Sequence, residues 1–239
     1  MAPIAAAMPR ASGGTSPFNP LSLAGLIWFV HPDAATDVVA GEINSVVDRK
    51  ALATFAAPAT TNRMPRNTTE RPGHVAAQTV TASADFLRCD TASLASPLNG
   101  SPAQTWLWLG RHTATSFLLQ ASNGTTLGSG GDRITISISS TAVQFNISGL
   151  SNWIMTHGVT YSQWHSYAVT YNGAGNASLY VDGAFAITIA NTHRVTTNLL
   201  RTFYCAGAGF IGPAGMCTGV LSATDIANWH DWVSSSANA

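Results

Sequence analysis

No pair of carboxylates in this chain has the spacing that acid–base catalysis on a sugar requires. The only two glutamates, Glu42 and Glu70, have no other acidic residue within four positions. Hydrolysis of a glycosidic bond uses two carboxylates that face each other across the sugar. On one strand they would have to alternate, because residues i and i+2 share a face. Asp33 and Asp37 follow a proline turn, which favours solvated loop positions, so we predict no catalytic residues.

Metal and phosphate chemistry also lack their usual sequence patterns. The three cysteines have no C-x-x-C spacing and the seven histidines show no H-E-x-x-H pattern, so we predict no metal site and no cofactor. Gly128–Asp132 is glycine-rich, but no Gly-Lys-Ser/Thr follows it, which favours a hairpin loop over a phosphate cradle. Buried free thiols are the favoured state of Cys89, Cys205 and Cys217, although the sequence leaves a Cys205–Cys217 bridge open.

One segment carries residues suited to binding a ligand or a partner. Leu150–His157 is predicted to be a loop or an edge strand, and it places Trp153, Met155 and His157 beside hydroxyl and amide groups. Aromatic rings next to such groups are typical of sugar-binding loops and also of protein interfaces. These three residues are therefore the candidate ligand or partner surface, with an ordinary buried crossover as the equal alternative.

Two other tryptophans and two histidines are predicted to have structural roles and no part in binding. Trp106 and Trp108 alternate along one predicted strand and share a face. That pattern favours core packing, or cover by a terminal helix, over a sugar-binding platform. His165 and His230 are expected at the rim of the fold without a special role.

The composition excludes several classes of protein. Eleven basic and eleven acidic side chains give a formal net charge of zero, and charged residues make up only 9% of the chain. Nucleic-acid binding depends on clustered Lys and Arg, so no nucleic-acid partner is expected. The 46% of apolar residues is enough for a packed core. No uninterrupted apolar run reaches the roughly 20 residues of a membrane-spanning helix, so no membrane partner is expected either.

The elements that must position these residues are predicted to be short antiparallel strands. Leu26–Val30 is a continuous apolar run that ends at a proline turn, which is typical of a strand buried on both faces. Residues 33–75 contain strand candidates and a long irregular connection. Many short strands separated by turn residues predict an all-β fold, a two-sheet antiparallel β-sandwich or jelly roll. Further strands are predicted at Asp85–Arg88, Gln104–Gly110, Ser116–Ala121, Arg133–Ser139, Ala142–Ile147, Trp164–Tyr171, Ala177–Val181, Phe185–Ala190, Thr202–Ile211 and Cys217–Leu221.

One turn in this series is specific. Asp182-Gly183 lies between two apolar runs, Leu179–Val181 and Ala184–Ile189. A two-residue Asp-Gly loop supplies the positive φ angles that a type I′ hairpin needs. With the strand before it, this hairpin predicts a three-stranded meander.

A short C-terminal helix is the second specific element. Ser222 can cap it, with Asp225 at the third position near the free amides and the positive end of the helix dipole. Leu221 and Ile226 have the spacing of a hydrophobic staple. The helix is predicted to pack on the sandwich through one apolar face, formed by Ile226, Trp229 and Val233.

Residues 1–22 are predicted to form an extended N-terminal arm, before a sandwich at residues 23–234 and a tail at 235–239. Small residues with proline and glycine breaks dominate the arm. It lacks the basic start of an export signal, and prolines interrupt its apolar stretch. Simple disorder and a strap that orders on a partner are equal alternatives, and the candidate attachment residues are Arg10, Phe18 and Pro20.

The meander resembles a known family. Ser162–Gly173 (SQWHSYAVTYNG), followed by Leu179–Gly183 (LYVDG), resembles the W-H-x-x-A-x-T-Y-D-G … L-Y-V-D-G signature of concanavalin A-like lectin/glucanase domains of the laminin-G-like group. Gly209–Ile226 is similar to the closing strand and helix of that group. The resemblance implies a lectin-like jelly roll.

The opening of the chain resembles the start of phage-encoded proteins of this fold. Phe18–Phe29 (FNPLSLAGLIWF) is similar to the pattern F-x-P-L-x-L-x-G-L-x-L-W-L-D-A, and a later segment of those proteins is echoed by Ala84–Leu87. The chain departs from the family at Val30, which follows Phe29 where the pattern reads W-L-D-A, and at Asn172, which replaces the usual Asp of the first turn. Both departures remove oxygens that could hold calcium, so no metal ligand is assigned.

Three functions are consistent with these patterns. The first is a non-enzymatic bacteriophage virion protein, a capsid decoration or head- or tail-fibre component, made in the host cytoplasm and exposed on the virion surface. It would contact other virion proteins through the arm, could form a homo-oligomer through its low-charge surface and could present the sandwich to host glycans. The second is a free-standing carbohydrate-binding lectin. The third is a glycoside hydrolase with unrecognised catalytic residues, which the scarcity of paired carboxylates disfavours.

Overall fold

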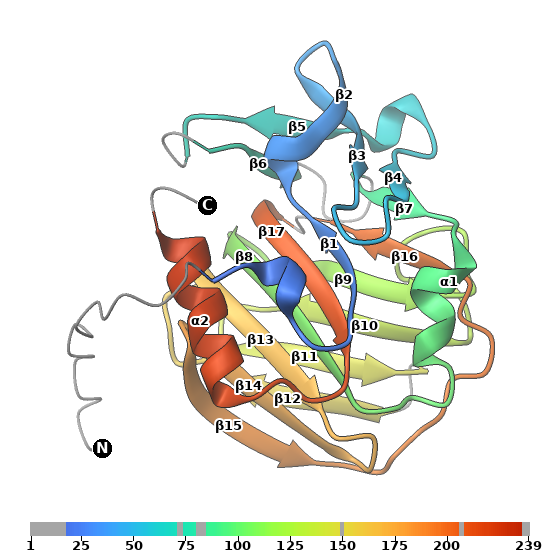
Figure 1. Cartoon of the computed structure of the whole chain (residues 1–239), viewed down its shortest axis with the longest axis vertical. Helices are drawn as coiled ribbons and strands as arrows, with labels where there is room; N and C mark the ends of the chain where they lie inside the picture. The colour runs from blue at the N-terminus through green and yellow to red at the C-terminus, as the bar shows by residue number, and fades with distance from the viewer. Residues whose placement is uncertain (1–17, 71–73, 80–84, 149–150, 206–207, 236–239) are drawn as a thin grey trace.

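The computed structural model of the chain describes residues 18–70, 74–79, 85–148, 151–205 and 208–235. These residues form an antiparallel β architecture with one helix near the C-terminus (Figure 1). Every strand pair in it is antiparallel. The predicted all-β class and C-terminal helix are therefore confirmed.

One group of strands runs in the order β1–β17–β8–β13–β14–β15, and β6 and then β5 extend it beside the first part of β17. β8 lies near the centre of this group, between β17 and β13. The strands are β1 (Leu26–Val30), β5 (Met64–Asn67), β6 (Ala76–Thr79), β8 (Gln104–His112), β13 (His165–Tyr171), β14 (Asn176–Val181), β15 (Ala184–Ala190) and β17 (Gly209–Thr218).

The second group runs in the order β2–β3–β4–β7–β16–β9–β10–β11–β12. Its two ends differ: β4 and β7 share a single paired position, whereas β10, β11 and β12 pair in an unbroken register. The strands are β2 (Ala35–Val39), β3 (Glu42–Val47), β4 (Thr54–Ala56), β7 (Leu87–Cys89), β9 (Ser116–Ser122), β10 (Arg133–Ile138), β11 (Ala142–Ile147), β12 (Ser151–Thr156) and β16 (Arg201–Tyr204).

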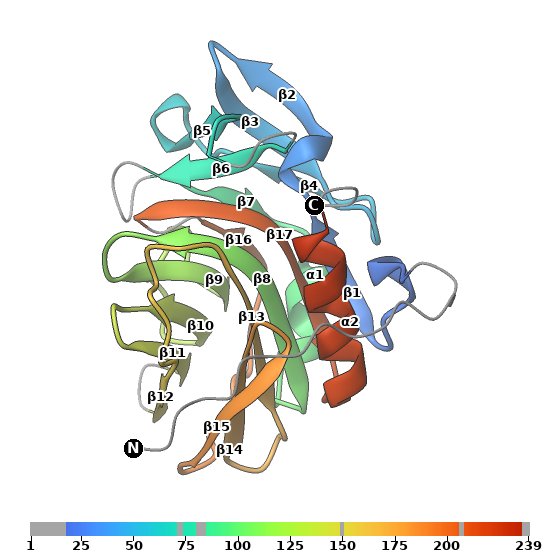
Figure 2. The same ribbon diagram turned by 90° about the vertical axis from the view of Figure 1, so that its left-hand side faces the viewer.

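The two groups are connected into one nearly closed sheet. β5 pairs with β6 of the first group and with β3 of the second. On the opposite side β12 and β15 lie beside each other, and the Asn191 Nδ2 donates to the Asn152 carbonyl oxygen over 3.0 Å. Figure 2 shows the two groups facing each other. The prediction of two separate sheets is therefore only partly met, because β5 belongs to both ladders.

Burial on both faces distinguishes β8 from its neighbours. Trp106 and Trp108 point into the core between the two strand groups, as predicted, and both are fully buried. Leu107 and Leu109 point to the other face, where a second apolar cluster lies under α2 (Ala223–Ser234). Alternate side chains of a strand face opposite sides, so β8 needs apolar residues at consecutive positions.

The helix α2 forms as the sequence predicts. The Ser222 hydroxyl accepts from the Asp225 amide and the Asp225 carboxylate accepts from the Ser222 amide, which completes a capping box. Ile226, Trp229 and Val233 are buried on the sheet. The Trp229 ring meets the Phe29 ring of β1 edge to face, with centroids 6.0 Å apart. The remaining helical turns are α1 (Ala92–Ala95), η1 (Pro20–Ser22), η2 (Pro32–Ala34), η3 (Thr60–Asn62) and η4 (Ser96–Leu98).

The end of the predicted N-terminal arm belongs to the folded body. Pro20 is buried in η1, which the Asn19 side chain caps, and Phe18 packs against the cluster under α2. Arg10 and the rest of residues 1–17 lie outside the described residues, as do residues 236–239 of the predicted tail. The attachment role of the arm stays a prediction.

Two strand boundaries differ from the predictions. Thr202–Ile211 was expected as one strand, but its ends lie in β16 and β17, which belong to different strand groups. β17 then continues to Thr218, so Cys217–Leu221 is not a separate strand. Apolar residues continue across both segments, and such a run does not show where the chain changes its pairing partner.

No disulfide links the three cysteines, all of which lie in the described part of the chain, and each is buried in a different apolar cluster. Cys89 lies in the main core, Cys217 under α2, and Cys205 in a small cluster with Phe86 and Phe203. Burial raises the pKa of the Cys217 thiol to about 12. The bridge between Cys205 and Cys217 that the sequence left open is therefore absent.

The Asp182-Gly183 turn adopts the predicted geometry. Both residues have positive φ, 51° and 75°, as a type I′ turn requires. A Cβ added at Gly183 would lie 3.0 Å from the His230 Cβ and 3.3 Å from the Ala227 Cα. Glycine is therefore needed here both for its backbone conformation and for the close approach of α2 to the turn.

The Asp182 side chain fixes the turn to β13. Its Oδ1 accepts from the Ser166 amide over 3.1 Å and its Oδ2 accepts from the His165 Nδ1 over 2.7 Å. The His165 Nε2 lies 3.2 Å from the Thr160 carbonyl oxygen. Because both ring nitrogens face acceptors, the ring is satisfied as a doubly protonated imidazolium. The hydrogen bond to Asp182 raises the pKa of His165 above its ordinary 6.5, against the opposing effect of burial.

The packing of α2 leads to a stability prediction. We expect Trp229→Ala to lower the free energy of unfolding by about 3–5 kcal/mol, because it leaves a cavity against Phe29. Asp231→Ala on the exposed face of the same helix is the control and should change stability little. Urea denaturation measures both. Equal effects of the two substitutions would contradict the packing described for α2.

The His165–Asp182 contact leads to a pH prediction. A raised folded-state pKa means that this contact stabilises fully below pH 6.5 and that its contribution is lost as pH rises through the folded-state pKa. The stability difference between the native chain and His165→Gln should therefore shrink between pH 6 and pH 9. Asp182→Asn should remove the same pH dependence, and thermal melts across this range measure it. A constant difference would show that the contact carries no charge.

Candidate functional site

The predicted surface residues Trp153 and Met155 are buried. β12 is an edge strand, as expected, but its alternation turns both side chains into the core, where they are 0% exposed. The Trp153 Nε1 donates to the Gly175 carbonyl oxygen over 2.8 Å. The prediction that these two side chains form a binding surface is therefore wrong, and the outward residues of the strand include Ile154, which is 54% exposed.

His157 is also buried, and backbone groups form hydrogen bonds with both nitrogens of its ring. The Val159 amide donates to its Nδ1 over 3.3 Å, so the ring proton resides on Nε2, which faces the Ser139 carbonyl oxygen at 3.1 Å. Neither nitrogen is left for a ligand. His157 therefore contributes to the wall of a neighbouring hollow but offers it no hydrogen-bonding group.

The structure places two hollows on either side of Asp182. The first, which we call the Phe185 hollow, has a volume of about 430 Å³ and lies between the end of β12 and the β14–β15 hairpin. The second, the Trp164 hollow, has a volume of about 350 Å³ and lies between β13 and the end of α2. The Phe185 hollow is lined by Thr156, His157, Gly158, Val159, Val181, Asp182, Ala184, Phe185 and Ala186, and the Trp164 hollow by Leu109, Trp164, His165, Ser166, Asp182, His230, Val233 and Ser234.

An aromatic ring stands in each hollow. Phe185 is 60% exposed and meets the Tyr180 ring edge to face at 5.6 Å. Trp164 is half-buried, donates from Nε1 to the Glu70 carbonyl oxygen over 3.3 Å and packs against the Phe210 ring. Both rings are held by neighbouring groups but keep an accessible surface, so each can stack on a flat apolar ligand face.

The shared carboxylate is ordered and accessible. The Asp182 side chain is 39% exposed although two contacts from β13 hold it in place. A carboxylate has about four acceptor positions, and two remain for a ligand hydroxyl. We call Asp182, the two rings and the two hollows the Asp182 site.

Ser166, His230 and Asp182 lie close together but do not form a catalytic triad. The Ser166 Oγ lies 2.8 Å from the His230 Nδ1, and the Asp182 Oδ1 lies 3.9 Å from the same nitrogen. A triad needs the nucleophile and the carboxylate on opposite ring nitrogens. Ser166 is also almost completely buried. The arrangement orients the His230 ring, which the Ser234 hydroxyl contacts as well.

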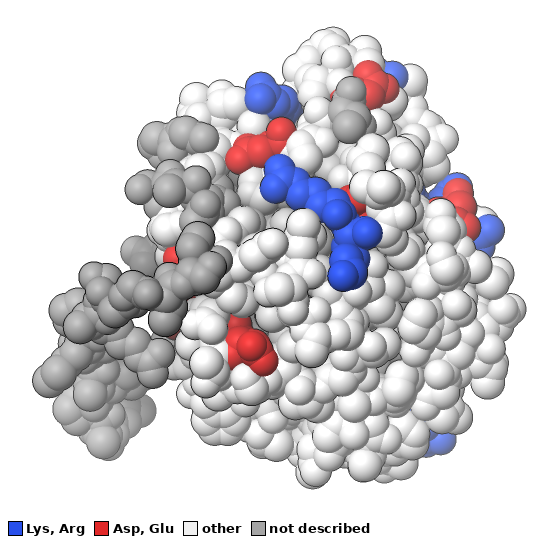
Figure 3. All heavy atoms as spheres, viewed as in Figure 1, with Lys and Arg blue, Asp and Glu red and all other residues white. Residues whose placement is uncertain are grey.

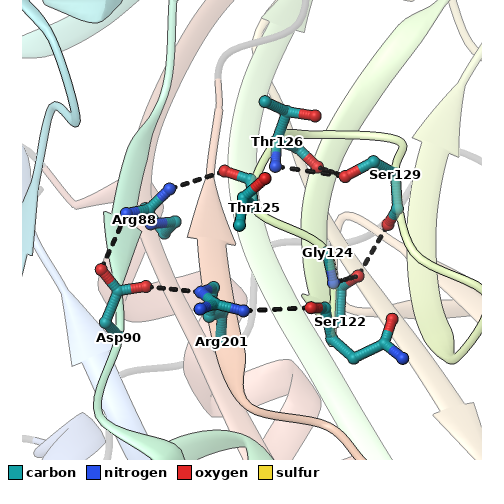
Figure 4. Close-up of polar contacts among 9 residues, drawn as sticks. Arg88, Asp90, Ser122, Gly124, Thr125, Thr126, Ser129 and Arg201 are labelled. Carbon is teal, nitrogen blue, oxygen red and sulfur yellow. Dashed lines mark hydrogen bonds and ion pairs between the residues drawn. The ribbon is translucent and has the colours of Figure 1, made fainter.

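A second polar cluster, formed by Arg88, Asp90 and Arg201, holds the glycine-rich loop in place. Figure 4 shows Arg88 and Arg201 sharing Asp90, with Arg88 also donating to the Thr125 carbonyl oxygen over 2.6 Å. The loop connects the paired strands β9 and β10, so the hairpin interpretation of Gly128–Asp132 is confirmed. The guanidinium groups bind backbone oxygens there, and the cluster is structural.

Charge is sparse on the surface as it is in the sequence. On the face seen in Figure 3, one band of Lys and Arg atoms lies near the centre, other charged atoms are scattered toward the edges and most of the surface is uncharged. Among the described residues, no three His, Cys, Asp or Glu side chains are placed to hold a metal ion. The helices in that part of the chain are all too short or too polar to cross a bilayer.

Sequence reasoning missed the Asp182 site for identifiable reasons. Asp182 was assigned a turn, and His165 and His230 were expected at the rim without a role. A sequence signal for the contact between Asp182 and His165 exists. Tyr167 pairs with Val181 in the hairpin register, and this register brings residue 165 beside the turn. No sequence signal places His230 there, since that depends on how α2 packs.

The chain is similar to known proteins in its fold but not in its sequence. No protein-family model and no curated protein matches the sequence. The chain is similar in structure to the botulinum neurotoxin type G receptor-binding domain (TM-score 0.60, 10% identity, 87% of this chain and 51% of that one). It is similar to the botulinum neurotoxin DC binding domain in complex with SialylT (0.55, 12%, 87% and 51%) and to Trypanosoma rangeli sialidase in complex with sialic acid (0.57, 12%, 88% and 33%).

These similarities show a shared β-rich fold. The chain spans about half the length of the toxin domains and a third of the sialidase. At 10–12% identity, the residues of the Asp182 site cannot be transferred from any of these proteins and must be read from this chain alone. The resemblance to a concanavalin A-like phage domain is not confirmed beyond this β-rich, lectin-like architecture.

Proposed function

We propose that this chain is a non-enzymatic glycan-binding module and that the Asp182 site is its binding surface. The observation that carries the proposal is an accessible, prepositioned carboxylate with an aromatic ring on each side. Sugar rings present flat C–H faces that stack on aromatic rings, and their hydroxyls donate to carboxylates. Binding sites for small ligands combine apolar walls with a few oriented polar groups in the same way.

The ligands of the structural neighbours support the proposal. One toxin binding domain was solved with SialylT and the sialidase with sialic acid. Those ligands belong to those proteins, and for this chain they indicate only that the fold can carry a sugar site.

The charges of the site support binding without hydrolysis. Glycosidases place two carboxylates roughly 5–9.5 Å apart across the bond that breaks. Asp182 is the single carboxylate among the described residues that line the two hollows. Asp182 accepts hydrogen bonds from the His165 Nδ1 and the Ser166 amide, which is the arrangement of an acceptor and not of a proton donor to a leaving group.

Within this role, we place the module on the surface of a bacteriophage particle. The support is the resemblance of Phe18–Phe29 to phage-encoded openings and a low-charge surface suited to packing against other virion proteins or further copies of itself. A free-standing lectin is the alternative and would use the same Asp182 site.

The glycan-binding role predicts the effect of removing one ring. Phe185→Ala should weaken binding of the best glycan on an array roughly tenfold, because about 1.5 kcal/mol of apolar contact is lost. Ile154→Ala is the matched control, since Ile154 is similarly exposed but lines neither hollow. Titration calorimetry measures both variants. Unchanged binding by Phe185→Ala, or no glycan bound by the native chain, would refute the proposal.

The virion placement predicts that mass spectrometry of purified particles detects this chain. Deletion of residues 1–17, which spares Phe18, the Asn19 cap and Pro20, should leave a folded protein that no longer joins the particle. Particle composition and a thermal melt of the truncated chain test the two statements. A particle that lacks the native protein would refute the placement and leave the glycan-binding role standing.

A further inference from the structure

The supply of cationic groups around the Asp182 site bears on the kind of ligand that it can hold. No Lys or Arg is among the described residues that line either hollow. The permanent charge there is the Asp182 carboxylate, and the remaining titratable side chains are His157, His165 and His230. Whether the site can accept an anion therefore depends on whether any cationic group is free to meet it.

Two of the three histidines are already committed. The His165 ring directs one nitrogen to Asp182 and the other to the Thr160 carbonyl oxygen, so its charge is neutralised by the carboxylate beside it. The His157 ring is held between a backbone amide and a backbone carbonyl oxygen. Neither ring has a hydrogen left for a ligand.

His230 offers a hydrogen-bonding nitrogen to the Trp164 hollow. Its Nδ1 lies 2.8 Å from the Ser166 Oγ and 3.3 Å from the Ser234 Oγ. Among the described residues no contact is found for its Nε2. Nε2 can therefore exchange a hydrogen bond with a sugar hydroxyl.

Arg111 is connected to the Trp164 hollow through Phe210, and its charge is paired with Glu70. Its guanidinium forms an ion pair with Glu70, donates from Nε to the Ser162 carbonyl oxygen over 2.9 Å and lies over the Phe210 ring. Phe210 in turn packs against Trp164. Arg111 thus supports the aromatic wall from behind and has no unpaired charge to offer.

From these contacts we infer that the Asp182 site selects neutral glycans and rejects those that end in a sialic acid or another carboxylate. The carboxylate of an anionic sugar in either hollow would lose hydration without a free cation to pair with, because the His165 charge is already paired with Asp182. An unpaired, desolvated charge of this kind disfavours binding. A neutral sugar meets no such penalty and can use Asp182 and His230 through its hydroxyls. This inference rests on the proposed glycan-binding role.

The inference runs against what the structural neighbours alone would indicate. Two of them are in complex with SialylT and with sialic acid. At 12% identity the fold is shared but the side chains of a site are not, so the local charges of this chain decide. Specificity of this kind depends on the penalty that the wrong ligand meets, such as an unpaired charge, as much as on attractive contacts.

The test is an array that presents the same oligosaccharides with and without a terminal sialic acid, followed by calorimetry on the best matched pair. For the native chain at pH 7.5 we expect the sialylated form to bind at least tenfold more weakly. His230→Arg places a permanent cation beside Asp182 and should reduce this ratio at least fivefold. Asn228→Arg adds the same charge on α2 outside both hollows and is the control.

The outcomes separate the two claims. Failure of the native chain to bind any member of the array would refute the glycan-binding role itself. Equal or tighter binding of the sialylated form would overturn the charge inference and leave glycan binding intact. An unchanged ratio in His230→Arg, with a melting temperature showing that the variant is folded, would also overturn it. The same change in ratio for Asn228→Arg would assign selectivity to overall charge instead of to the Asp182 site.

Discussion

Burial of both faces of β8 is the constraint on which the rest of the structure depends. Trp106 and Trp108 fill the space between the two strand groups, while Leu107 and Leu109 require cover on the outer face. α2 supplies that cover, and its capping box fixes where the helix begins. Since the outer face of a central strand cannot stay apolar and exposed, the position of the helix follows from the sequence of β8.

The same packing assembles the Asp182 site. His230 follows Trp229 directly, so the residue that anchors α2 also determines where the imidazole lies. Gly183 lets the helix approach the hairpin turn closely, and Asp182 then connects the turn to β13. The site thus belongs to three elements whose spacing is set by core packing. A site on such rigid elements loses little entropy when a ligand binds.

Local patterns were predictable from the sequence where neighbouring residues decide the structure. The limits of Leu26–Val30 and Ala142–Ile147, the type I′ turn and the helix cap all match, because strand length, φ and capping are set within a few residues. The orientation of Trp153 could not be predicted in this way. Whether an aromatic residue on an edge strand faces the core or the solvent depends on register, and one shifted residue reverses it.

The site itself required the tertiary structure. Asp182 and His165 meet through hairpin register, which the sequence contained, but His230 joins them through helix packing, which it did not reveal. Between residues 35 and 67 the sequence indicates strand candidates but not their limits, for another reason. They are short and partly exposed, as at Val38, and their alternation is too weak to distinguish them from loops.

The distribution of the three thiols has a practical consequence. Since Cys89, Cys217 and Cys205 occupy separate apolar clusters, each would react with an alkylating reagent only when its own cluster opens. The rate of modification at each position would report the local opening of the interior, of the layer beneath the terminal helix or of the pocket around Phe203. The native chain thus carries three built-in probes of regional flexibility without any engineered label.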